Sequence, residues 1–197
     1  ETFAARMRER GNADFITTLE GRHYSYRDAL DASARLAGAL NTLGVSPGDR
    51  VAVQVDKSPE AILLYLACLR LGGVYLPLNP GYTADEVRYF LTKQAEPWDL
   101  IEPREHNDLA AILYTSGTTG RSKGAMLTHR NLGSNAATLQ EFWRFTAADR
   151  LIHALPIFHT HGLFVGCNVT LIAGSSMLFL PTFDADLIFA EMAHGTV

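Results

Sequence analysis

An apolar segment enclosed by turn residues constrains the fold of this 197-residue chain more than any other feature. Ser58-Pro59-Glu60 predicts a helix start, because serine caps free amides and proline fits the first helical position. Residues 61–69 (AILLYLACL) are apolar on every side, so we expect this helix to be buried, and Gly72-Gly73 to end it. Apolar strands are predicted at 51–55 and 74–78. Together these elements predict a right-handed βαβ unit with parallel strands.

The rest of the chain also alternates between helical and strand patterns, so we predict an α/β fold rich in parallel sheet. Helix caps are predicted at Ser25 with Asp28, at Thr83 with Glu86, and at Asp184. No fixed-period repeat is evident. The predicted elements are a hairpin of 14–19 and 22–24, helices at 26–43, 129–143, 162–173 and 185–193, and strands at 109–114, 150–155 and 176–180.

Composition excludes several classes of protein. The chain is 47% hydrophobic and 19% charged, with 17 basic and 21 acidic residues, and no basic cluster favours a nucleic-acid partner. The longest apolar segment is too short to span a bilayer, and the first ten residues lack a signal-peptide core, so no membrane partner is expected. Cys68 and Cys167 are too few for a disulfide framework or a zinc site. We expect two buried thiols, no metal site and a cytoplasmic location.

A loop rich in glycine and hydroxyl groups follows the predicted strand 109–114. Residues 115–124 (TSGTTGRSKG) contain five serines or threonines, three glycines and one lysine. Glycine allows the backbone to approach a ligand closely, and hydroxyls and amides donate to anionic oxygens. The pattern therefore indicates a polyphosphate-binding loop, although it fits neither the Walker A motif nor GxGxxG. A flexible surface loop is the alternative.

The string YTSGTTGRSKGAMLTHRN, residues 114–131, closely resembles the signature loop of the adenylate-forming superfamily. This AMP-binding superfamily includes acyl-CoA synthetases, peptide-synthetase adenylation domains and luciferases. The segments at 24–26 and 69–79 resemble two further motifs of the family, with structural roles only. The resemblance implies that the loop wraps the β- and γ-phosphates of ATP, with Lys123 neutralising their charge. The phosphate-binding residues would be Thr115, Ser116, Gly117, Thr118, Thr119, Gly120 and Lys123.

A turn after the predicted strand 150–155 carries the second group of candidate residues. Turns at this end of a parallel sheet commonly bind ligands. His159 and His161 could form a metal pair, but no acidic or cysteine cluster accompanies them. His159 aligns with the histidine of the Pro-x-Phe/Tyr-His motif of acyl-CoA synthetases, which implies contact with the acyl and adenylate groups, while a structural role remains equally open for His161. The acyl-site residues would be His159, Thr160, His161 and Gly162.

The same turn indicates the substrate. Amino-acid-activating relatives place an aspartate here, whereas this chain has Phe158-His159, which argues against a free amino acid. The polar rim suits a short acid with a second polar group, and residues 153–184 are similar to malonyl-CoA synthetases. The resemblance implies a ligase that converts malonate, CoA and ATP to malonyl-CoA, AMP and pyrophosphate, with Mg²⁺ as a cofactor. The alternatives are a CoA ligase for another short or aromatic acid, and a non-catalytic N-terminal fragment.

The resemblance covers almost the entire chain but less than half of the family fold. We divide the chain into a first α/β portion (1–95), an irregular segment (96–108) that marks a break or a deletion, and a phosphate-loop and acyl-site portion (109–197). The family's C-terminal part, with its adenylating lysine, is missing, so we expect an incomplete N-terminal domain that is inactive alone, with no certain catalytic residue.

The remaining histidines are assigned no role in the chemistry; His129 is expected to be solvated or capping. Phe142 and Trp143 are expected in the core.

Overall fold

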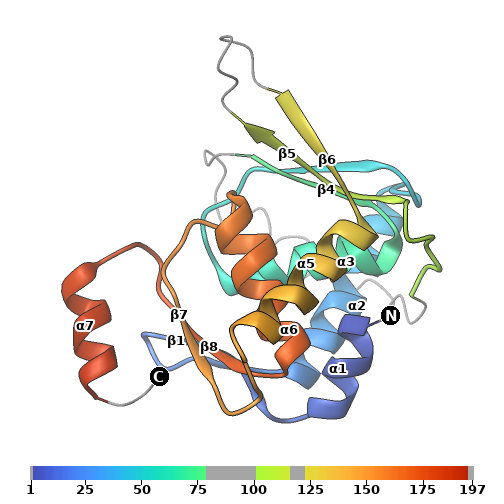
Figure 1. Cartoon of the computed structure of the whole chain (residues 1–197). Coiled ribbons are helices and arrows are strands. Elements are labelled where there is room, and N and C mark those ends of the chain that lie inside the picture. Colours follow the sequence, from blue (N-terminus) through green and yellow to red (C-terminus); the bar gives the residue numbers. More distant parts are fainter. Residues whose placement is uncertain (1, 79–100, 116–122, 195–197) are drawn as a thin grey trace. The chain divides into compact units, whose positions relative to one another are not determined.

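The computed structural model describes residues 2–78, 101–115 and 123–194, which form two compact units. The first unit combines residues 1–30 with 134–197, and the second comprises residues 31–133. Each unit contains one four-stranded sheet (Figure 1). The first unit is discontinuous in sequence, and both units contain residues of the predicted portions 1–95 and 109–197. The division into those portions stays a prediction.

The sheet of the first unit has the order β2-β1-β8-β7. Strands β7 and β1 both pair with β8 in parallel, and β2 pairs with β1 in an antiparallel hairpin. The elements of this unit are α1 (Thr2–Arg10), β1 (Asp14–Thr18), β2 (His23–Ser25), β7 (Arg150–His153), a π-helix η1 (His161–Cys167), α6 (Asn168–Ala173), β8 (Ser176–Phe179) and α7 (Ala185–Ala193).

The sheet of the second unit has the order β3-β4-β5-β6. Strands β3, β4 and β5 are parallel, and β6 is antiparallel to β5. Helices α2 (Tyr26–Thr42) and α5 (His129–Phe142) each begin in one unit and end in the other. The other elements of this unit are β3 (Arg50–Val53), α3 (Pro59–Leu71), β4 (Val74–Pro77), β5 (Leu109–Thr115) and β6 (Lys123–Thr128).

The predicted βαβ unit is present as β3-α3-β4, with Val51 paired to Tyr75 in the parallel register. Ser58 caps α3 by accepting from the amide of Ala61, and Gly72 ends the helix in the left-handed conformation. Most of α3 is buried, as its apolar composition requires. The mixed α/β fold with parallel strands is therefore confirmed. The predicted cap of Thr83 and Glu86 lies outside the described residues.

Two elements were not predicted from sequence. Helix α1 is polar, with Met7 as its buried residue, and the Nε of Arg6 donates to the carbonyl of Ile172 at 2.9 Å, holding α1 against α6. Strand β6 has exposed residues at 124–126 and pairs with β5. The partner of α1 is distant in sequence, whereas β6 pairs with the preceding strand but lacks the alternation of apolar and polar residues that marks a strand.

The prediction that Phe142 and Trp143 lie in the core is wrong. Their exposed fractions are 79% and 52%. The buried residues of α5 are Leu132 and Ala136, so its core-facing surface ends before the last turn. Arg144 follows in the left-handed conformation (φ 55°), so the helix ends directly after the two aromatic residues.

The chain passes twice through the order hairpin, helix, strand, helix, strand, although its sequence shows no repeat. Asp49 and Asp149 show the correspondence in detail. Asp49 accepts from the amide of Ser46 at 2.9 Å, and Asp149 accepts from the amide of Thr146 at 2.6 Å. The first pass runs from β1 to β4 and the second from β5 to β8, and we call them the first and second half of the chain. The hairpin of each half pairs with a parallel strand of the other half: β1 pairs with β8, and β5 pairs with β4.

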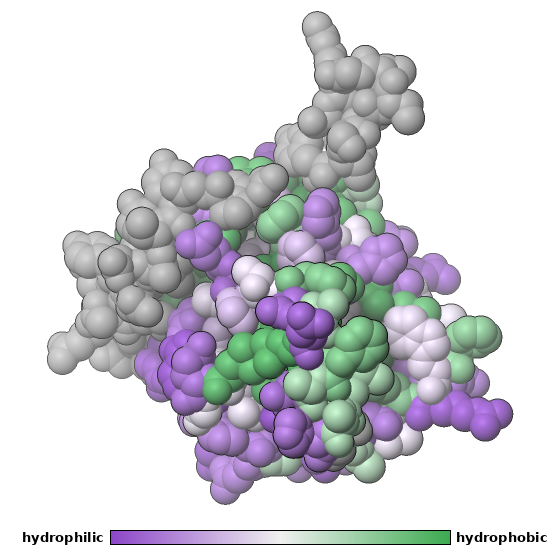
Figure 2. Space-filling view, turned by 90° about the vertical axis from the view of Figure 1, so that its left-hand side faces the viewer, coloured by the Kyte–Doolittle hydropathy of each residue, from purple (hydrophilic) through white to green (hydrophobic). Residues whose placement is uncertain are grey.

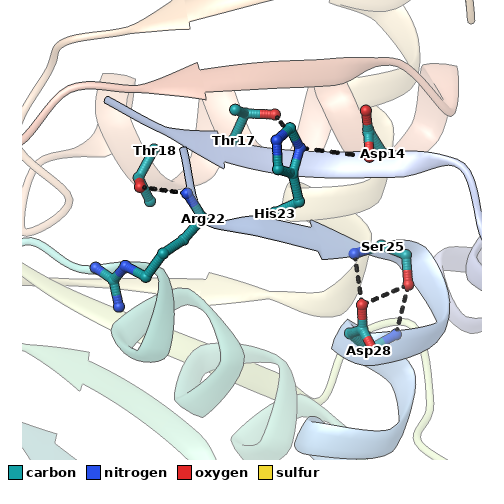
Figure 3. Close-up of polar contacts among 7 residues, drawn as sticks. All are labelled: Asp14, Thr17, Thr18, Arg22, His23, Ser25 and Asp28. Carbon is teal, nitrogen blue, oxygen red and sulfur yellow. Dashed lines mark hydrogen bonds and ion pairs between the residues drawn. The ribbon is translucent and has the colours of Figure 1, made fainter. Parts of the chain in front are cut away.

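The two hairpins differ in their turns. The turn between β1 and β2 is short, and the hydroxyl of Thr18 accepts from the amide of Arg22 across it (Figure 3). Figure 3 also shows the predicted cap of α2, in which Asp28 accepts from the amide and hydroxyl of Ser25 at 2.8 and 2.7 Å. The corresponding turn between β5 and β6 is longer and contains the glycine-rich loop.

Helix α7 begins at the predicted cap Asp184, which accepts from the amide of Leu187 at 3.0 Å. Leu187 and Ile188 pack against a small cluster of buried residues on β8 and beside β7. Figure 2 shows the side of the molecule on which α7 lies, and apolar residues (green) gather on this surface. Phe189 and Met192 of α7 are 70% and 56% exposed. Within the described residues, no helix is long and apolar enough to cross a bilayer.

Candidate functional site

The glycine-rich loop is held by the hairpin of β5 and β6. Thr115 pairs with Lys123 in the antiparallel register, and Tyr114 pairs with Gly124. Residues paired in this way have Cα atoms about 5 Å apart. The two ends of the predicted phosphate loop therefore lie side by side. The other predicted phosphate-binding residues lie outside the described residues: Ser116, Gly117, Thr118, Thr119 and Gly120.

The two strands of this hairpin have different surroundings. Strand β5 lies between β4 and β6 and buries Ala110, Ala111 and Leu113. Strand β6 is at the edge of the sheet, where Met126 is 70% exposed. A buried strand therefore fixes the start of the loop, while the returning strand is open to solvent.

The loop begins at the carboxyl end of β5, which is parallel to β3 and β4. Tyr75 of β4 is opposite Ala111 of β5, so β5 continues beyond the level at which β4 ends. Ligands of α/β proteins commonly bind outside the carboxyl ends of parallel strands. Thr115, the first residue of the predicted phosphate loop, lies at this end of β5.

The turn between β7 and η1 carries the other predicted residues. His159, Thr160 and His161 are exposed, and Gly162 is buried. The carbonyl of His159 accepts from the amide of Leu163 at 3.0 Å, and the ring of Phe158 lies 4.6 Å from the His159 ring. The structure thus brings all four residues into one turn whose polar side chains face solvent.

Gly162 makes this turn compact. A Cβ atom at this position would overlap the carbonyl oxygen of Pro156. A side chain here would force apart the two ends of the segment that carries His159. The requirement for glycine is therefore steric, and the predicted role of Gly162 in binding the acyl group stays a prediction.

The segment predicted as one helix, 162–173, consists of the π-helix η1 followed by α6. π-helical turns are uncommon and often occur at functional sites. His153, the last residue of β7, lies beside this turn, and its Nε2 is 2.7 Å from the carbonyl oxygen of Gly162. This contact could not be predicted from sequence, because a single histidine at a strand end carries no signal of it.

The prediction that His129 is solvated or capping is wrong. Thr128 caps α5 instead: its hydroxyl accepts from the amide of Asn131 at 3.2 Å, and its own amide donates to the Asn131 side chain at 2.9 Å. His129 is half-buried, and burial lowers its pKa, with a smaller contribution from Arg104. The pair Thr128 and Asn131 has the spacing of a capping box and could have been recognised from sequence.

Cys68 and Cys167 are buried free thiols, as predicted. Burial raises the pKa of Cys68 to about 12, so its thiol is protonated at neutral pH. Among the described residues, there is no group of three or more histidine, cysteine or acidic side chains that could hold a metal ion. The alternative of a metal pair at His159 and His161 therefore lacks further ligands among those residues.

The sequence and the structure are both similar to members of one enzyme family. The model of the AMP-binding enzyme family matches residues 3–97 and 92–196. The crystal structure of apo MatB from Rhodopseudomonas palustris superimposes with a TM-score of 0.89 at 42% identity, covering 98% of this chain and 47% of MatB. ATP-bound MatB gives a TM-score of 0.88 with the same coverage.

Curated relatives are more distant. Feruloyl-CoA synthase from Amycolatopsis sp is 29% identical over 212 aligned residues, covering 90% of this chain and 43% of the relative. Indoleacetate–CoA ligase from Aromatoleum aromaticum is 29% identical over 215 aligned residues, covering 85% of this chain and 42% of the relative. The chain therefore spans less than half the length of these relatives.

Proposed function

The chain belongs to the AMP-binding, adenylate-forming acyl-CoA ligase family, and on this premise we propose that it is the N-terminal part of an ATP-dependent malonate–CoA ligase. The observation that carries the proposal is the glycine- and hydroxyl-rich loop held between Thr115 and Lys123 at the carboxyl end of β5. The 42% identity to MatB, which has been crystallised with ATP, supports it.

The loop would bind the β- and γ-phosphates of ATP. Its hydroxyl and amide groups donate to phosphate oxygens, and Lys123 supplies a positive charge. Hydrogen bonds to charged groups are each worth about 1.5–3 kcal/mol, so several together hold a polyphosphate firmly. Mg²⁺ would enter with ATP as part of the substrate, and no described residue is assigned to it.

The reaction has two steps. A carboxylate oxygen of malonate attacks the α-phosphorus of ATP, which forms the acyl-adenylate as the bond to the β-phosphate breaks and pyrophosphate leaves. The CoA thiol then loses its proton and attacks the acyl carbonyl, which releases AMP and forms the thioester. The residues of this chain would contribute by positioning the reactants and by neutralising phosphate charge.

The turn at Phe158-His159 would contact the acid. Its exposed polar side chains, His159, Thr160 and His161, can donate to a carboxylate. No acidic side chain in this turn is available to pair with a substrate ammonium group. The turn therefore suits a short acid with a second carboxylate better than an amino acid. Use of ATP and CoA fits a cytoplasmic location.

The experiment is an acid panel assayed with the complete enzyme that contains this chain. AMP release that depends on both malonate and CoA, with a clear preference for malonate over acetate, is expected. Absence of malonate-dependent AMP release would contradict the substrate assignment. Activity with no acid, or without CoA, would contradict the assignment as a CoA ligase.

A ligase for an aromatic acid is the second candidate. The names of two relatives, feruloyl-CoA synthase and indoleacetate–CoA ligase, favour it, and the Phe158 ring beside His159 could contact an aromatic substrate. Ferulate and indoleacetate therefore belong in the same panel. A higher kcat/KM for either of them than for malonate would favour this candidate.

A further inference from the structure

The imidazole of His153 closes the base of the turn that carries His159. His153 is the last residue of β7 and is 3% exposed. Its ring stacks on the ring of Phe179, the paired residue of β8, with centroids 5.2 Å apart and an interplanar angle of 24°. Stacking on Phe179 therefore holds the imidazole ring in place, independently of its contact with the turn.

The contact is made to one backbone oxygen. Nε2 of His153 lies 2.7 Å from the carbonyl oxygen of Gly162. A carbonyl oxygen only accepts, so Nε2 carries the hydrogen. The thiol of Cys167 donates to the same oxygen at 3.4 Å. Two side chains thus converge on the Gly162 carbonyl, in the first turn of the π-helix.

Gly166 leaves the space in which the His153 imidazole can lie close to the backbone of η1, and Gly162 lets that backbone lie close to Pro156. A Cβ on Gly166 would come within 3.1 and 3.2 Å of the Cδ2 and Nε2 atoms of His153. A Cβ on Gly162 would overlap the carbonyl of Pro156. The π-helix therefore presents backbone, with no side chain between, to the imidazole on one side and to Pro156 on the other.

We propose that His153 is a positioning residue for the acid substrate, in addition to its place in the core. It acts through Gly162: its hydrogen bond sets the first turn of η1, and this turn sets where His159, Thr160 and His161 lie. The proposal rests on the proposed function, in which those three side chains contact the acid. Loss of the hydrogen bond should therefore weaken recognition of the acid more than binding of ATP.

Two amide variants test the contact atom by atom. In His153→Gln the side-chain nitrogen can take the place of Nε2, whereas in His153→Asn the nitrogen reaches only the position of Nδ1. His153→Leu removes the donor. Replacement of the exposed His106 by leucine is the control for loss of a histidine.

The first readout is hydrogen exchange measured by mass spectrometry on the complete enzyme, comparing residues 159–167 with the buried helix α3 in the same sample. The asparagine and leucine variants should exchange faster at 159–167 with α3 unchanged, and the glutamine variant should match the wild type. Equal protection in the asparagine and glutamine variants would overturn the proposal. Faster exchange in both regions of the glutamine variant would do the same, because it would show a global structural role.

The second readout is steady-state kinetics of the complete enzyme. The asparagine and leucine variants should raise KM for the acid about tenfold, as expected for loss of one hydrogen bond, and change KM for ATP less than twofold. Glutamine should restore the acid KM. A parallel rise in both KM values would overturn the proposal. If the wild type activates no acid, the proposed function fails, and the exchange experiment still decides whether His153 fixes the turn.

Discussion

Thr115 and Lys123 are backbone partners across β5 and β6, so the predicted phosphate loop starts and ends at a single point of the sheet. The equivalent hairpin of the first half, β1 and β2, closes with a short turn between Thr18 and His23. The connection between the two strands is therefore longer in the hairpin of the second half, and the additional residues belong to the predicted phosphate loop. The hairpin stem places Lys123 next to the first residue of the loop, whatever ligand the loop binds.

Replacement of Lys123 by alanine should weaken ATP binding. Loss of one hydrogen bond to a charged group costs about 1.5–3 kcal/mol, which corresponds to a roughly 10- to 100-fold rise in Kd. Isothermal titration calorimetry with MgATP measures it. Arg130→Ala is the matched control, because it removes the same charge from the exposed start of α5, beyond the other end of β6. Equal Kd values for wild type and Lys123→Ala would refute the assignment of Lys123.

Replacement of His159 by alanine should raise KM for the acid substrate of the complete enzyme about tenfold, because one polar contact to the acid is lost. Binding of ATP should be unchanged. His106→Ala, at an exposed position of the second unit, is the control. An acid KM equal to that of the wild type would show that the His159 turn does not contact the acid.

Replacement of Tyr26 by phenylalanine should destabilise the fold. The Tyr26 hydroxyl is buried and donates to the carbonyl of Ser175 at 2.6 Å, with Thr170 as a second acceptor at 3.0 Å. Removal leaves buried acceptors without this donor, which costs about 1–3 kcal/mol. Urea denaturation measures the change. Tyr24→Phe, at a more exposed position, should change stability by less than about 0.5 kcal/mol; a similar loss in both variants would contradict the account.

Stability should fall as the pH rises above 9, and Cys68 should cause part of the loss. Burial raises the pKa of this thiol from 9.0 to about 12. Between these values the unfolded thiol ionises while the folded thiol stays protonated, so the unfolded state binds fewer protons and is favoured as pH rises. The difference in unfolding free energy between wild type and Cys68→Ala should decrease by about 1.4 kcal/mol per pH unit in this range. A constant difference from pH 8 to 11 would show that the thiol is not desolvated.

Much of the fold could be predicted because its signals are local. Ser58, Gly72 and Asp184 mark helix ends through their own hydrogen bonds and conformations. The apolar composition of α3 indicates burial without knowledge of its neighbours. Helix α1 could not be predicted, because it is held by Ile172, far away in the chain. Strand β6 could not be predicted, because its residues show no alternation of apolar and polar side chains and it forms by pairing with β5.

The candidate site was predictable only in part. The role of the string 114–131 as a phosphate loop stays a prediction, and the structure shows that its ends pair across β5 and β6. The turn at His159 follows its strand as expected. The π-helix was not predictable, because the apolar pattern of 162–173 is that of an ordinary helix, and the contact of His153 with the carbonyl of Gly162 carries no sequence signal. Phe142 and Trp143 show the converse, since apolar side chains at the end of a helix are not necessarily buried.

Exchange of labelled pyrophosphate into ATP, catalysed by the complete enzyme without CoA, tests directly whether this chain is part of an acid-activating ligase. An enzyme that forms an acyl-adenylate reverses this step, so malonate should stimulate exchange strongly and Lys123→Ala should reduce the stimulation. Exchange that does not respond to malonate or to any other acid of the panel would contradict the account of this chain as part of an acid-activating ligase.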